Sequence, residues 1–126
     1  MYISAYGLNW LATQVAGQAI TISLHTGAPG NAGTSNELAT TGGAAYARLA
    51  VAASSWSATN AVTDNDANIV VFTPNATDAG SIVTHVGYWF STNFFGWVEL
   101  AAPVTLVAST PFTILAGTAD FAFEAA

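Results

Sequence analysis

The sequence contains no cysteine and very little charge. Without cysteine the chain can form neither a disulfide nor a thiolate metal site. Only 6% of its 126 residues are Asp, Glu, Lys or Arg, against about 25% in ordinary soluble domains. Because a free monomer normally needs a charged surface to stay dispersed, we expect much of this surface to be covered by other subunits in a homo-oligomer or lattice. The alternative is a monomer whose surface is kept soluble by Thr and Asn.

Positive charge is almost absent, since Arg48 is the one basic residue and the formal net charge is −6. Binding to nucleic acid or to an anionic membrane needs several Lys or Arg side chains, so neither partner is expected. The apolar runs are far shorter than the ~20 residues of a spanning helix. No basic segment follows Met1, so a secretory signal is not expected either.

The length fits a single domain covering residues 1–126. A helix is predicted from about residue 4 to about residue 16, with Ser4 as its N-cap and Gly17 as its stop. The apolar residues of this segment recur at helical spacing and form one stripe: Leu8, Leu11, Ala12 and Val15.

After this helix the apolar residues alternate with polar ones, which predicts strands. Residues 20–25 should form a half-buried strand with its Thr, Ser and His side chains on the outer face. Further strands are expected over residues 46–52, on either side of a polar turn at Asp64–Asn65, and in an aromatic hairpin near residue 92. Seven to nine short strands predict an all-β, antiparallel β-sandwich or barrel-like fold.

No catalytic, cofactor-binding or metal-binding residue is predicted. His25 and His85 lack a third His or Cys that would complete a common zinc site, and we expect hydrogen-bonded structural histidines. Residues 64–68 superficially resemble the start of a calcium loop, but Ile69 and Asn75 occupy the positions that need Gly and Glu. Motifs for nucleophilic catalysis and for phosphate binding are also absent. The chain is therefore not expected to be an enzyme.

Arg48 is expected to form a structural tie with Glu37. The guanidinium group binds a carboxylate with two parallel hydrogen bonds. Glu37 lies just upstream of the Gly42–Gly43 break and is the natural partner. Such a pair would hold the long loop that precedes Arg48.

The aromatic hairpin is predicted to be a contact surface as well as part of the core. Strand alternation places Tyr88 and Phe90 on one face of the sheet and Trp89 on the other. One sandwich cannot bury every ring of this stretch, and large exposed apolar patches usually mark interaction sites. The alternative is that the N-terminal helix covers this face. The predicted interface residues are Tyr88, Trp89, Phe90, Phe94, Phe95 and Trp97.

A series of blocks resembles a family of short tailed-bacteriophage virion proteins, which are often labelled tail fibre proteins. The blocks are Leu24–Gly27 (LHTG), Pro29-Gly30, Asn36-Glu37, Tyr46–Arg48 (YAR) and Thr84–Gly87 (THVG). The resemblance runs from about residue 3 to the C terminus. It implies a β-sandwich virion protein without enzymatic activity, and it extends to small capsid cement proteins that sit as trimers on the shell.

The first functional hypothesis is a capsid decoration (cement) protein that binds the major capsid protein on the outer surface of the capsid and stabilises the shell. The second is a tail fibre or tail-tip component, which contacts neighbouring tail subunits or a receptor. A lectin or small carbohydrate-active enzyme is the third, and it depends on exposed tryptophans alone. Copy number per virion and gene position would separate the first two hypotheses, and sugar binding would test the third.

Overall fold

The computed structural model of the chain describes residues 1, 3–119 and 121–122. The chain forms two compact units, each assembled from separated segments. The first comprises Met1–Ala19, Val51–Ile69 and Ile114–Ala126, and the second comprises Ile20–Ala50 and Val70–Thr113. A single sandwich domain over residues 1–126 stays a prediction.

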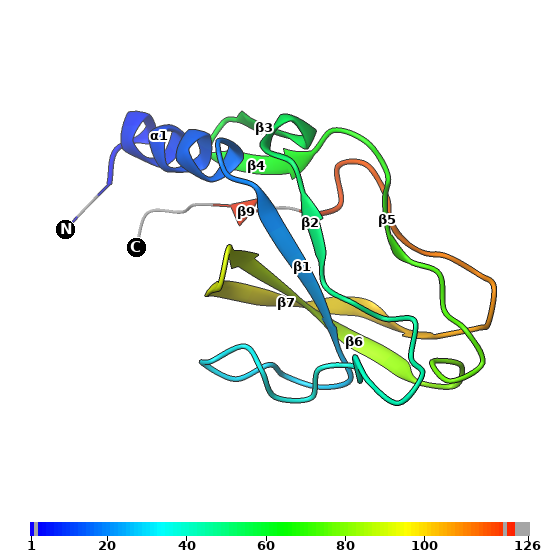
Figure 1. Cartoon of the computed structure of the whole chain (residues 1–126). Coiled ribbons are helices and arrows are strands. Elements are labelled where there is room, and N and C mark those ends of the chain that lie inside the picture. The colour runs from blue at the N-terminus through cyan, green and yellow to red at the C-terminus, as the bar shows by residue number, and fades with distance from the viewer. Residues whose placement is uncertain (2, 120, 123–126) are drawn as a thin grey trace. The chain divides into compact units, whose positions relative to one another are not determined.

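The first unit contains the helix α1 (Ala5–Ala16), which begins and ends where the sequence predicts (Figure 1). The Ser4 side chain accepts a hydrogen bond from the Gly7 backbone N–H, and Gly17 caps the other end. Serine is a preferred N-cap because its hydroxyl satisfies a backbone donor that the helix itself leaves unpaired. Ala12 and Val15 are the buried residues of the helix, which packs on β3 and β4.

A small antiparallel sheet completes this unit, with strand order β3-β4-β9. The short 3₁₀ helix η1 (Ala53–Ser55) leads into β3 (Trp56–Thr59), which is followed by β4 (Val62–Asn65), and β9 is Phe121–Ala122. The alternation of Phe121 and Phe123 with Asp120, Ala122 and Glu124 predicts a last strand, of which Asp120, Phe123 and Glu124 lie outside the described residues.

The predicted turn at Asp64–Asn65 is wrong, because both residues lie in β4. The chain turns instead at Asn60 and Ala61, whose φ angles are 51° and 65°. Two successive left-handed residues suit a tight hairpin. Asparagine tolerates that conformation but alanine does not favour it, so this turn could not be predicted from the residue types.

The second unit is built on an antiparallel sheet with the order β2-β1-β6-β7 (Figure 1). Its strands are β1 (Ile20–His25), β2 (Leu49–Val51), β6 (Ile82–Phe90) and β7 (Asn93–Thr105). β6 and β7 form the predicted aromatic hairpin. A separate two-stranded ribbon pairs β5 (Ile69–Phe72) with β8 (Phe112–Ile114).

Both faces of β1 are buried apart from the half-buried Thr21, so the prediction of a half-buried strand is wrong. Ile20, Ile22 and Leu24 on one face are fully buried, as expected for core residues. Ser23 and His25 on the other face are also 0% exposed. Buried polar groups need hydrogen-bond partners, and these partners form the site described below.

The fold class is confirmed, since the chain is mostly strands in antiparallel sheets with one short N-terminal helix. In the described part of the chain the sheets do not close into a barrel. The predicted strand over residues 46–52 is shorter than expected, because only Leu49–Val51 pairs as β2. None of the helices in the described part of the chain could span a membrane.

Candidate functional site

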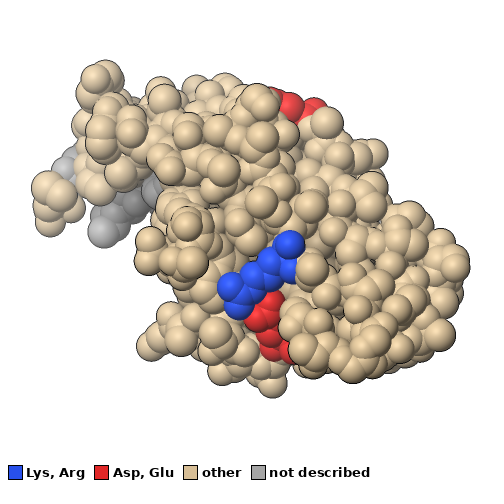
Figure 2. Space-filling view, viewed as in Figure 1, with Lys and Arg blue, Asp and Glu red and all other residues tan. Residues whose placement is uncertain are grey.

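Glu37 and Arg48 form a bidentate ion pair in the second unit. Glu37 is held by a backbone bridge to His25 at the end of β1, and Arg48 directly precedes β2. Arg48 Nε donates to Glu37 Oε1 at 2.8 Å, and Nη2 donates to Oε2 at 2.7 Å. In Figure 2 Arg48 is the blue group, with a red carboxylate beside it on an otherwise almost uncharged face. The predicted pair therefore exists, and its role as a structural tie stays a prediction.

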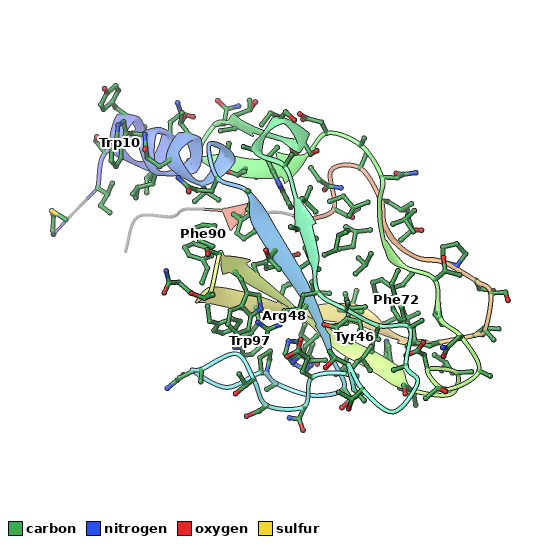
Figure 3. All side chains as sticks on the ribbon, viewed as in Figure 1. Trp10, Tyr46, Arg48, Phe72, Phe90 and Trp97 are labelled. Carbon is green, nitrogen blue, oxygen red and sulfur yellow. The ribbon has the colours of Figure 1, made fainter. Side chains whose placement is uncertain are left out.

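Tyr46 extends this ion pair into the core. Its hydroxyl donates to Glu37 Oε1 and accepts the backbone N–H of Leu24, both at 3.0 Å. The buried Tyr46 ring meets Phe72 edge-on, with centroids 5.4 Å apart. One hydroxyl thus connects the carboxylate to the backbone of β1. Figure 3 shows Tyr46 and Arg48 close together. The sequence did not indicate that Tyr46 and Arg48 share a partner.

The ionised forms of the pair are favoured by these contacts. Burial alone would raise the pKa of Glu37, but the hydrogen bonds from Arg48 and Tyr46 outweigh it, so this pKa lies below its ordinary value. The hydrogen bond to Glu37 raises the pKa of Arg48. Burial raises the pKa of Tyr46 well above its ordinary value. Glu37 and Arg48 are therefore charged, and Tyr46 keeps its proton, at neutral pH.

Arg48 also lies over the indole of Trp89, with its guanidinium carbon 3.8 Å from the ring centroid. A cation over an aromatic face is attracted by the electrons of the ring. Trp89 comes from β6 and is buried, whereas Arg48 is 32% exposed and Glu37 15% exposed. The guanidinium group thus contacts both the Glu37 carboxylate and the Trp89 indole on the face of the sheet.

A directional chain of hydrogen bonds continues from the same indole. Trp89 Nε1 donates to Ser23 Oγ at 2.8 Å, and Ser23 Oγ lies 2.7 Å from His25 Nε2. His25 Nδ1 lies 2.9 Å from the carbonyl oxygen of Ser35. Because a carbonyl can only accept, Nδ1 carries the proton, and a neutral His25 accepts the Ser23 hydroxyl at Nε2. Burial lowers the pKa of His25, which favours this neutral form.

The contact between Ser23 and His25 has the atoms of a nucleophile and its base, but it is closed to a substrate. Both side chains are fully buried. Gly87, directly across from Ser23 on β6, lacks a side chain because a Cβ there would overlap Ser23 Oγ and lie 3.0 Å from His25 Nε2. Nucleophilic catalysis requires a substrate atom within about 3–3.5 Å of the nucleophile. We therefore read these hydrogen bonds as structural ties.

The loop over residues 27–36 is held by the hydrogen bonds that continue from Trp89 through Ser23 and His25. Ser35 receives the His25 hydrogen bond, and Asn36 accepts the backbone N–H of Thr26 at 2.8 Å. Gly33 lies against the Phe94 ring with a φ of 74°, where a side chain would be strained and would overlap that ring. The loop therefore packs on the β6–β7 hairpin. Nothing in the sequence indicated this contact with the hairpin.

His25, His85 and Glu99 occupy neighbouring positions in one row across three strands. The row resembles a metal-ligand set, but His25 is engaged at both ring nitrogens. His85 Nδ1 lies 2.7 Å from Thr84 Oγ1, and its ring meets Trp97 at 5.1 Å. Among the described residues, no group of three or more His, Asp or Glu side chains is placed to hold a metal ion.

The predicted contact surface divides into buried and exposed rings. Tyr88 and Trp89 are buried, so neither presents its ring on the surface of this chain. Phe95 and Trp97 are 45% and 47% exposed. Phe90 and Phe94 lie between these limits, and Phe90 stacks on Phe95 at 4.7 Å. In Figure 3 Phe90 and Trp97 lie at the hairpin end of the sheet. An interface at these residues stays a prediction.

Comparison with known proteins gives one result for nearly the whole chain. No curated protein matches, and no solved structure matches. The family described as Podophage GP4 fiber I protein gp80 matches residues 2–122, a range that contains the complete site around Glu37 and Arg48 and both strands of the aromatic hairpin. The chain therefore belongs to the family of the podophage GP4 fiber I protein gp80.

Proposed function

We propose that the chain is a non-enzymatic structural component of a fibre on a tailed-phage virion, where it acts by contact with other virion subunits. The observation that carries the proposal is the family match over residues 2–122. It favours the second of the hypotheses drawn from the sequence over capsid decoration.

The arrangement of the side chains supports a contact role. The polar cluster around Glu37 is satisfied internally, with each member bonded to another part of the second unit. Groups engaged in this way fix the fold and are not available to turn over a substrate. Outside the cluster the surface carries few charges and several exposed apolar side chains. Such a surface loses little favourable hydration when a neighbouring subunit covers it.

We also propose that the chain works as a homo-oligomer. The low charge content supports this proposal, because an uncharged surface disperses poorly as a free monomer. A trimer is the form that the resemblance to cement proteins implies, whereas the strand edge described below favours a dimer.

Capsid decoration is the competing proposal, and the sparse charge is compatible with it. The two differ in location and number. A decoration protein covers the shell and is present in proportion to the capsid lattice, whereas a fibre protein is present in proportion to the fibres. A decoration protein would bind the major capsid protein. A fibre protein would bind a neighbouring fibre or tail subunit.

The test is to locate the chain on purified virions. Gold-labelled antibodies against the chain should mark fibres in electron micrographs, and quantitative mass spectrometry should give a copy number that follows the number of fibres. Labelling spread evenly over the shell, with a copy number that follows the major capsid protein, would establish decoration and reject the fibre proposal.

A further inference from the structure

The four-stranded sheet of the second unit ends on one side in a long, exposed strand. β7 has 13 residues, and each of them is exposed or half-buried. Among the described residues, β7 pairs only with β6 and forms one end of the strand order. A terminal strand presents backbone N–H and C=O groups along its outer edge, which is a template for pairing with another strand.

This edge lacks the usual protection against pairing with another chain. Native proteins guard terminal strands with lysines and other charges, but Glu99 is the one charged residue in β7. Trp97, Val98 and Val104 are large apolar side chains that are 41–47% exposed. Trp97 and Val98 are successive residues in the register with β6, so apolar groups flank the edge on both faces of the sheet.

We propose that the outer edge of β7 pairs antiparallel with β7 of a second copy of this chain, which extends the sheet across a two-fold axis. The register with β6 is regular from Gly96 to Glu99, and we place the pairing on this stretch. A two-fold axis at Trp97 or Val98 brings apolar residues together and keeps the two Glu99 carboxylates from lying directly opposite each other. Beyond this stretch, Pro103 removes one backbone donor.

The charge distribution favours a second copy over a different protein. A partner strand with basic residues could pair them with only one carboxylate along β7. A second β7 carries the same apolar side chains and an edge that is equally poor in charge. The pairing alone buries less than the roughly 800 Å² per partner of a standard specific interface. The isolated protein should therefore associate weakly, and the contact should form fully where many copies are held close together. The inference concerns the chain itself and does not depend on the fibre proposal.

The test compares two Val-to-Lys substitutions. Val98 is 45% exposed on β7, and Val107 is 57% exposed outside it, so both variants add the same charge at a site that tolerates it. Sedimentation velocity over a wide range of protein concentrations should show reversible dimers for the wild type. Val98→Lys should raise the dissociation constant about tenfold or more, since it places a cation in an apolar contact. Val107→Lys should leave the constant unchanged.

Hydrogen exchange of the full chain supplies the second measurement. Amides in β7 should become more protected as the wild-type concentration rises, and this gain should be absent in Val98→Lys. A wild type that stays monomeric throughout overturns the proposal. So does association that both variants retain equally, or association without added protection in β7. Circular dichroism of Val98→Lys confirms that a loss of pairing is not a loss of fold.

Discussion

Arg48 connects more of the second unit than its position near the surface indicates. Its guanidinium group bonds both oxygens of Glu37 and lies over Trp89. Exposed ion pairs contribute little to stability, whereas a buried charge without its partner is costly. Glu37 is mostly buried and Arg48 is about one-third exposed, so this pair lies between the two cases.

We expect Arg48→Met to lower the free energy of unfolding by about 1–3 kcal/mol. The substitution keeps an aliphatic side chain beside Trp89 but leaves the Glu37 carboxylate with Tyr46 as its remaining side-chain donor. Glu37→Gln should cost less, because the amide can still accept from Tyr46 and water reaches Arg48. Urea unfolding of both variants and of the double variant measures the coupling. Negligible changes in all three would show that the pair does not stabilise the fold.

The second residue-scale prediction concerns pH and His25. Its pKa in the folded protein lies below the ordinary 6.5 because of burial. As the pH falls below about 6.5, the unfolded chain takes up the proton first, so stability is greatest above this pH and falls toward the lower folded pKa. The loss is at most about 1.4 kcal/mol per pH unit. The corresponding loss from Glu37, whose folded pKa is also lowered, comes only below its ordinary 4.5.

Urea unfolding between about pH 8 and about pH 5 separates these two groups, since Glu37 stays ionised over that interval. His25→Gln removes the titrating group and serves as the comparison. It should be less stable at every pH, but its stability should change less with pH than that of the wild type. An identical pH dependence in the two proteins would contradict the assignment to His25.

The ion pair between side chains could be predicted from the sequence. The hydrogen bonds between uncharged side chains could not. Arg48 has no competitor for a carboxylate, so Glu37 could be predicted as its partner. Ser23 and Trp89 are separated by 66 residues, and neither is an unusual residue type for a strand. Only the register of β1 with β6 brings them together.

At the scale of elements, β1 and β6 meet at a position where only glycine fits. A Cβ on Gly87 would overlap Ser23 Oγ and lie 3.3 Å from the Phe94 ring. The same addition at Gly96 on β7 meets no atom within 4 Å. The two glycines belong to one hairpin and differ in this respect, which makes them a matched pair.

Gly87→Ala should lower the free energy of unfolding by about 1–3 kcal/mol, because the crowded side chains must move and weaken the bonds of His25 and Trp89. Gly96→Ala should be neutral or slightly stabilising, since alanine reduces the freedom of the unfolded chain. Thermal unfolding of the two variants gives the comparison. Equal losses of stability would show that the contact across β1 and β6 relaxes without cost.

The predictability of each element followed from its local signals. The helix was predictable because the apolar spacing, the Ser4 cap and the Gly17 stop agree. The turn at Asn60–Ala61 was not, because an alanine with positive φ is imposed by the strands on either side. The burial of both faces of β1 was also missed, since it depends on a loop that returns over the strand.

At the scale of the whole molecule, the net charge opposes association. The proposed contact between two β7 strands contains almost no charged residues. Copies with a net charge of −6 repel one another, and salt screens this repulsion. A contact held by ion pairs would weaken as salt is added. We therefore expect the dissociation constant of the isolated protein to fall when sodium chloride is raised, which sedimentation at low and high salt measures. A constant that rises with salt would indicate a contact based on ion pairs.

The fold class and the family resemblance were accessible from the sequence because strand alternation and the order of the short blocks run along the whole chain. The division into two compact units was not, since each unit is assembled from separated segments. Contacts between segments far apart in the chain leave no periodic pattern in it.

The two edges of the four-stranded sheet differ in length, with three residues in β2 and 13 in β7. A polymer grows only when each member offers two sites for attachment. A sheet with one long open edge offers a single site, and a two-fold pairing occupies it in both members at once. Growth through this sheet therefore stops at two copies. Because only one edge of the sheet is long, the protein can keep a strand that pairs with another copy and still avoid the continuous stacking of strands that produces amyloid.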